Sequence, residues 1–146
     1  MNRNYSDARY LIRLSSAVQR GDARVLEDAI RFLEADPLSF RTGYAKEHVW
    51  KYLVRRYTLD ITTIERLYTI ALHNLERPIR REFWSMCNAI ARLANKAFWQ
   101  RVLELTSSER IDVAKRAQYL YTYSQGLEAG ERMHQYVSAA WRWRRG

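Results

Sequence analysis

The sequence predicts an all-α protein of about eight short helices, paired as four antiparallel hairpins in a helical stack. Apolar residues recur three and four positions apart through almost all 146 residues. Capping residues and helix breakers interrupt that pattern at short intervals. Only Tyr119 to Tyr123 alternates as a β-strand does, and a lone strand has no partner, so we expect this segment to be helical. A compact, irregular helical bundle is the alternative architecture.

The first four helices are expected in the first half of the chain. The first spans about residues 6–19, and Asp22 caps the second. The second ends before Pro37, because a residue that precedes proline avoids the helical conformation. The third follows Gly43 and carries apolar residues over so wide an arc that we expect contacts on two sides. Asp60 caps the fourth, which has the cleanest apolar stripe in the chain.

The other four helices are expected between Pro78 and the C-terminus. Pro78 suits the first position of helix five, because its fixed φ is helical and the first N–H groups lack intrahelical acceptors. Asn95 caps helix six, and Thr106-Ser107-Ser108-Glu109 matches a capping box that opens helix seven. Gly126 and Gly130 interrupt the pattern near its end, and helix eight runs from about Glu131 to Trp143.

Length and composition predict a single all-helical domain over residues 1–146. An apolar content of 47% argues against intrinsic disorder, and five Gly and two Pro leave little material for flexible linkers. The first residues lack the apolar segment of a signal peptide, and charge-free stretches are too short for a membrane span, so we expect a soluble, cytoplasmic protein. The single cysteine, Cys87, lies in an apolar pattern that predicts a buried thiol.

The two prolines mark a weak internal repeat. Pro37 and Pro78 lie 41 residues apart, each follows a Leu-Glu pair at the end of a helix, and each precedes an apolar residue. In this respect the chain resembles HEAT and armadillo-type helical repeat proteins, whose units of two helices run to about 40 residues. The resemblance implies a curved helical stack whose surface binds proteins or, less often, nucleic acid.

No catalytic motif accompanies the helical pattern. His48, His73 and His134 have no His, Cys or carboxylate partner at a metal-binding helical spacing. No nucleophile elbow, phosphate-binding loop or dinucleotide fingerprint is present. We therefore expect no enzyme activity, no metal and no cofactor.

The charge predicts an acidic partner, which is an acidic protein surface or a nucleic acid. The net charge is +9 with a pI near 10.0, and most of the cations are arginines. Arg77, Arg80 and Arg81 fall where the first turn of helix five is expected, the end at which the helix dipole disfavours cations. They predict an anion site; the alternative is pairing with Glu76, Glu82 or the acidic C-terminus of a neighbouring helix.

Stacked hairpins bring the N-termini of their first helices and the C-termini of their second helices to one edge. This edge is expected to be basic, whereas the opposite edge, with Arg55 and Arg56, is less charged. Among the aromatic residues, Trp84 is expected to be exposed, and Trp50 and Trp99 are expected in the core. The C-terminal Trp and Arg residues suit nucleic-acid stacking or a protein interface, and their alternative is a docked last helix. The predicted partner-binding or anion-binding residues are Arg41, Lys46, Arg77, Arg80, Arg81, Trp84, Trp141, Arg142, Trp143, Arg144 and Arg145.

The sequence thus predicts a non-enzymatic interaction module of the adaptor, inhibitor or antidote type. It is expected to bind an acidic protein partner through a basic surface that carries aromatic residues. The alternative is a nucleic-acid-binding protein that contacts phosphates through an arginine-rich edge.

Overall fold

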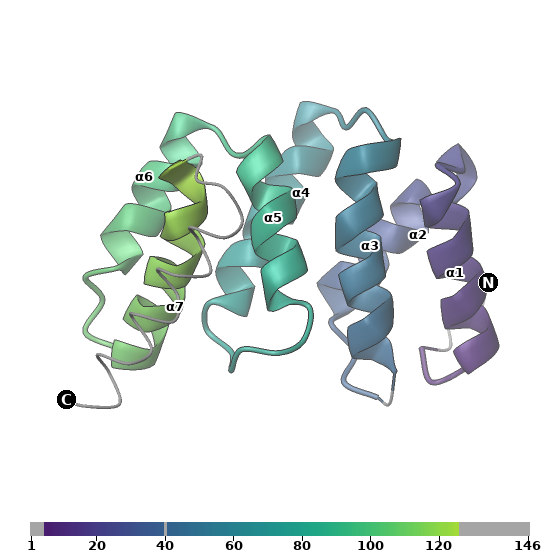
Figure 1. Ribbon diagram of the computed structural model, residues 1–146, viewed down its shortest axis with the longest axis horizontal. Coiled ribbons are helices and arrows are strands. Elements are labelled where there is room, and N and C mark those ends of the chain that lie inside the picture. The colour runs from purple at the N-terminus through teal and green to yellow at the C-terminus, as the bar shows by residue number, and fades with distance from the viewer. Residues whose placement is uncertain (1–4, 40, 126–146) are drawn as a thin grey trace. The chain divides into compact units, whose positions relative to one another are not determined.

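The computed structural model describes residues 5–39 and 41–125, and these residues form helices and loops with no β-strand (Figure 1). The all-α prediction is confirmed, and the segment from Tyr119 is helical as expected. The predicted eighth helix lies outside the described residues. The 3₁₀ turns are η1 (Ala23–Val25) and η2 (Tyr123–Gln125), and the α-helices are α1 (Ala8–Gln19), α2 (Leu26–Ala35), α3 (Thr42–Arg56), α4 (Ile61–Asn74), α5 (Phe83–Leu93), α6 (Lys96–Leu105) and α7 (Ile111–Thr122).

Short polar side chains cap α-helices at two predicted positions. Asp60 accepts a hydrogen bond from the Thr63 N–H at 2.8 Å, and Asn95 accepts one from the Phe98 N–H at 2.8 Å. Asp22 accepts from the Arg24 N–H at 3.0 Å, but it caps the 3₁₀ turn η1 and not α2, which begins after Val25. Such bonds satisfy backbone donors that have no partner within the helix.

The predicted capping box at Thr106 is wrong. Helix α6 continues to Leu105, and Thr106 is its C-terminal cap, with an Oγ1 hydroxyl that donates to the Leu103 carbonyl at 2.5 Å. Helix α7 begins only at Ile111. The hydroxyl therefore satisfies a carbonyl at the end of one helix instead of an N–H at the start of the next.

The predicted start of helix five at Pro78 is also wrong, because α5 begins at Phe83. The Arg80 carbonyl accepts the Phe83 N–H at 3.0 Å in a turn before the helix. Side chains of this turn, from Arg77 and Arg80, bind Asp36 at the end of α2. These long-range ion pairs override the preference of proline for a first helical position.

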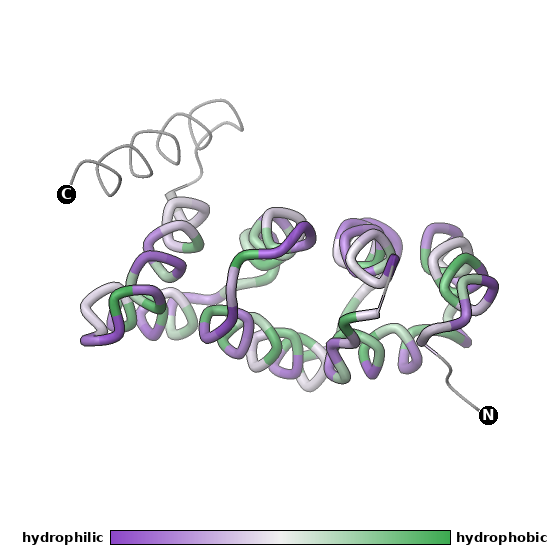
Figure 2. The backbone as a smooth tube through the Cα atoms, turned by 90° about the horizontal axis from the view of Figure 1, so that it is seen from below, coloured by the Kyte–Doolittle hydropathy of each residue, from purple (hydrophilic) through white to green (hydrophobic). Residues whose placement is uncertain are grey.

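The chain divides into two compact units, one that ends at Leu93 and one that begins at Ala94. In the first unit, α1, α3 and α5 lie side by side in one layer, and α2 and α4 form a second layer against it (Figures 1 and 2). Helix α3 lies between α1 and α5 and contacts both, as its wide apolar arc predicts. Trp50 on α3 is 1% exposed, which confirms its place in the core.

The turn after α1 packs closely against the end of α3. Gly21 has a φ of 72°, and a Cβ at this position would lie 3.1 Å from the Arg56 carbonyl oxygen. Beside it, the Tyr57 hydroxyl donates to the Asp22 carbonyl at 2.8 Å. Glycine is needed here both for the left-handed backbone and for the close approach.

The second unit contains the hairpin of α6 and α7. Among the described residues, those buried in this hairpin are Phe98 and Val102 on α6 and Val113, Ala117, Tyr119 and Leu120 on α7. Trp99 packs edge-on against Tyr121, with 6.3 Å between ring centroids. Trp99 is only half-buried, which corrects its assignment to the core.

Candidate binding surface

The structure brings Lys46, Arg77 and Arg80 together on one edge of the first unit, around the carboxylate of Asp36 at the end of α2. Lys46 Nζ lies 2.6 Å from Asp36 Oδ1, and Arg80 Nη2 lies 2.7 Å from Asp36 Oδ2. Arg77 also binds Asp36. We call these four residues, Asp36, Lys46, Arg77 and Arg80, the Asp36 cluster.

Asp36 follows the last residue of α2, so the pairing alternative for the arginines is correct: they bind the acidic C-terminus of a neighbouring helix. Glu82 supports the same cluster, at 3.4 Å from Arg80 Nε and 3.7 Å from Lys46 Nζ. Arg81 pairs with Glu47 at 2.6 Å instead. In the described part of the predicted edge, carboxylates therefore accompany the cations, and Lys46, Arg77, Arg80 and Arg81 are all paired within the protein.

Burial decides the role of Lys46. Its side chain is 3% exposed, which corrects its expected place on a binding surface. Burial raises the pKa of Asp36, but hydrogen bonds from Lys46 and Arg80 outweigh it, so the pKa stays below its ordinary value. The Asp36 cluster thus connects α2 and α3 to the turn before α5.

The remaining predicted residues are not part of the Asp36 cluster. Arg41 is exposed and precedes α3 with a φ of 73°. Trp84 is half-buried, with its ring edge-on to Phe83, so the expectation of an exposed aromatic holds only in part. The residues predicted at the C-terminus lie outside the described residues: Trp141, Arg142, Trp143, Arg144 and Arg145.

The two layers of the first unit differ in net charge, which the sequence analysis did not predict. Helices α1, α3 and α5 carry seven Lys and Arg residues and one carboxylate, Glu47. Helices α2 and α4 carry four carboxylates and two arginines. Arg66 on α4 binds Glu27 and Glu34 on α2 at 2.8 Å and 2.6 Å, and its hydrogen bond to Glu27 helps to lower the pKa of Glu27 to about 2. The acidic layer is therefore largely paired, and the excess positive charge belongs to the other layer.

Part of this excess lines a groove of about 240 Å³ between α3 and α5, which we call the basic groove. Its charged lining residues are Lys51, Arg55 and Arg92, all exposed, and no carboxylate among residues 5–39 and 41–125 lines it. Ser85 and Asn88 add neutral polar groups. The sequence analysis places Arg55 on the less charged edge. The spacing of Lys51 and Arg55 nevertheless indicates two cations on one face of a helix, because residues four apart share a face.

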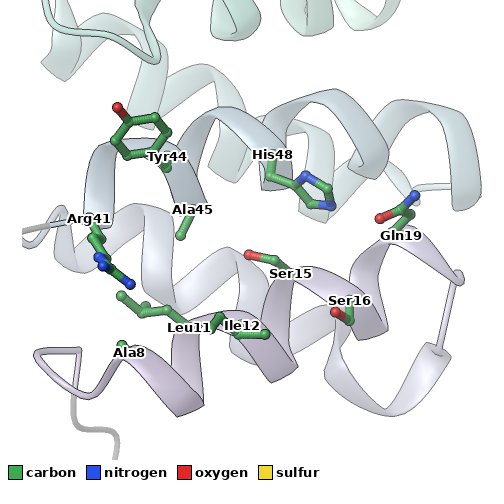
Figure 3. Close-up of a pocket in the computed structure, with 10 residues that line it drawn as sticks. All are labelled: Ala8, Leu11, Ile12, Ser15, Ser16, Gln19, Arg41, Tyr44, Ala45 and His48. Atoms are coloured by element: carbon green, nitrogen blue, oxygen red, sulfur yellow. The ribbon is translucent and has the colours of Figure 1, made fainter.

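A second groove, of about 570 Å³, lies between α1 and α3, and we call it the apolar groove (Figure 3). Leu11 and Ala45 are buried in it, whereas Ile12 and Tyr44 are 60% and 59% exposed. Arg41 lies at one end, and Gln19 lies at the other (Figure 3). Aliphatic side chains line part of its walls, Ser15, Ser16 and His48 add polar groups along it, and polar groups also lie at both ends.

His48 separates the two grooves on α3. The ring packs on Tyr52 with 4.6 Å between centroids, and its buried Nε2 atom has no hydrogen-bond partner among the described residues. Burial, followed by the nearby Lys51 ammonium, lowers the pKa of His48 below 6.5. This shift favours the neutral imidazole in the folded protein.

We expect this burial to make the free energy of unfolding fall as pH decreases from 7.5 to 5.5. The unfolded chain takes up a proton near pH 6.5, whereas the folded chain stays neutral until a lower pH, so stability is complete above 6.5 and decreases below it. Urea unfolding of His48→Gln should show a smaller decrease over this window. His73→Gln, at an exposed position, should retain the wild-type decrease, and a His48→Gln curve parallel to wild type would contradict the assignment.

Other chemistry is sparse in residues 5–39 and 41–125. No three His, Cys, Asp or Glu side chains there are grouped to hold a metal ion. Cys87 is fully buried, as predicted, and burial raises the pKa of its thiol well above the ordinary value. In the same residues, no helix is long and apolar enough to cross a membrane. Comparisons of the chain with protein-family models, with curated proteins and with solved structures find no match.

Proposed function

We propose that this chain is a non-catalytic interaction module that binds an acidic protein partner on the outer face of its α1/α3/α5 layer. The observation that carries the proposal is the basic groove, where Lys51, Arg55 and Arg92 face solvent and none of the described carboxylates lines the wall. An adaptor, an inhibitor or an antidote would use such a surface in the same way.

The chemistry of the basic groove suits carboxylates. A guanidinium group offers a planar pair of donors that matches the two oxygens of an Asp or Glu side chain. The cations of the Asp36 cluster already have this partner, whereas the structure gives Lys51, Arg55 and Arg92 no carboxylate partner within the described residues. Binding of an acidic segment would therefore add ion pairs without breaking existing ones.

The apolar groove favours a protein over a nucleic acid as the partner. It lies across α3 from the basic groove, and it offers exposed aliphatic and aromatic surface at Ile12 and Tyr44. A nucleic-acid backbone presents mainly phosphate and sugar, which leave such a surface unused. The resemblance to HEAT and armadillo-type proteins also implies protein binding, and the two-layer packing of the first unit supports it.

Fluorescence anisotropy with defined probes tests the proposal. A labelled peptide of ten glutamates should bind the full chain at low salt, and its ten-glutamine counterpart should not. Labelled single-stranded and duplex DNA and RNA of similar length serve as competitors. Tight nucleic-acid binding with a steep salt dependence, together with no peptide binding, would replace the proposal by a phosphate-binding function.

A further inference from the structure

We infer that the partner is an extended acidic segment that carries a large apolar side chain. This side chain enters the apolar groove, and the carboxylates of the same segment reach the basic groove. The inference rests on the proposed function and deepens it. It adds a contact in the apolar groove to the contact in the basic groove, and it thereby specifies which kind of acidic segment binds.

Helix α3 places both grooves on one face of the layer. Its exposed or half-buried residues Tyr44, His48, Lys51 and Arg55 follow the spacing of four, three and four that defines one side of a helix. This ridge has Ala45 and the apolar groove on the α1 side, and it has Val54 and the basic groove on the α5 side. A segment that crosses α3 therefore meets both grooves.

The surroundings of the apolar groove select an acidic occupant. Helix α1 contains no carboxylate and carries Arg9 and Arg13, and Arg41 closes one end of the groove (Figure 3). Glu47, the one carboxylate on the three helices, is already bound to Arg81. Basic segments would be repelled over the whole face, whereas acidic segments would be attracted to it.

Helix packing sets the spacing of the two contacts. Neighbouring packed helices lie about 8–10 Å apart, so the grooves on either side of α3 are separated by about one such distance. An extended chain advances about 3.3 Å per residue, so the apolar side chain and the carboxylates are expected about three residues apart. Both contacts thus fit within one short linear segment.

Two ten-residue peptides test the inference by anisotropy. Each carries four consecutive glutamates in a Gly/Ser background; the first has a leucine two residues before them, and the second has serine at that position. Wild type should bind the leucine peptide about ten-fold more tightly, because the groove removes the leucine side chain from water. A ten-fold change in Kd corresponds to about 1.4 kcal/mol.

The substitution Ile12→Gln should remove this preference for leucine while leaving the affinity for the serine peptide unchanged. Ile61→Gln is the matched control, because Ile61 is 72% exposed on α4 in the other layer, and it should retain the full preference. Equal binding of both peptides by wild type, or a preference that survives Ile12→Gln, would overturn the inference and leave the proposed function standing. Absence of binding by either peptide would overturn both.

Discussion

Asp36→Asn is expected to lower the free energy of unfolding by about 3 kcal/mol, the range typical of removing one member of a buried ion pair. Lys46, at 3% exposure, loses its closest counter-charge, and Glu82 at 3.7 Å replaces it only in part. Both Asp36 oxygens accept hydrogen bonds from Arg80, so the new amide N–H₂ faces a guanidinium group. Asparagine tolerates the left-handed backbone at this position, where φ is 48°, so the effect reports the lost charge.

Urea unfolding followed by circular dichroism measures this loss of stability. Two further variants test whether it comes from the buried ion pair. Glu34→Ala removes an ion pair with Arg66 that is more exposed, and it should cost less than about 1 kcal/mol. Adding Lys46→Met to Asp36→Asn should recover part of the loss, since the buried cation is then gone. If Asp36→Asn were no more costly than Glu34→Ala, the Asp36 cluster would not stabilise the packing of α2 and α3 against the turn before α5.

The double substitution Lys51→Glu and Arg55→Glu is expected to weaken binding of the ten-glutamate peptide about 100-fold. Each reversal turns an attraction into a repulsion, and a cost of about 1.4 kcal/mol for each corresponds to about ten-fold in Kd. Both side chains are exposed, so helix content and the unfolding midpoint should stay close to wild type. Anisotropy titrations at 0.15 M salt measure the change.

Arg9→Glu with Arg13→Glu is the matched control. It makes the same change in net charge, on exposed positions of α1 that do not line the basic groove. At 0.15 M salt, electrostatic interactions are screened over about 8 Å, so the control should reduce the affinity only a few-fold. Equal losses in the two variants would show that the peptide responds to overall charge, and the basic groove would lose its assigned role.

Features that depend on neighbouring residues in the sequence were predictable. Periodic apolar residues placed the helices, and Asp60 and Asn95 marked helix starts because a cap acts on an N–H three residues away. The two-sided packing of α3 followed from the width of its apolar arc. In each case, the physical cause lies within a few residues of the signal.

Features that depend on distant residues were not predictable in the same way. The turn before α5 binds Asp36, which lies 41 residues before Arg77 and 44 before Arg80. Topology placed these arginines on an edge with α2, but it did not reveal that Asp36 would bind both together with Lys46. The basic groove was missed because it combines residues of two helices that are not consecutive in the chain.

The unequal charge of the two layers also gives the first unit an electric dipole directed across its thickness. A negatively charged body that diffuses toward this unit experiences a torque before contact, because one side attracts it and the other does not. The same face would then arrive first in each encounter, so the charge difference between the layers orients the partner during its approach as well as strengthening the final contacts. That difference comes from the order of helices along the chain, in which α1, α3 and α5 are basic, α2 is acidic and α4 is neutral.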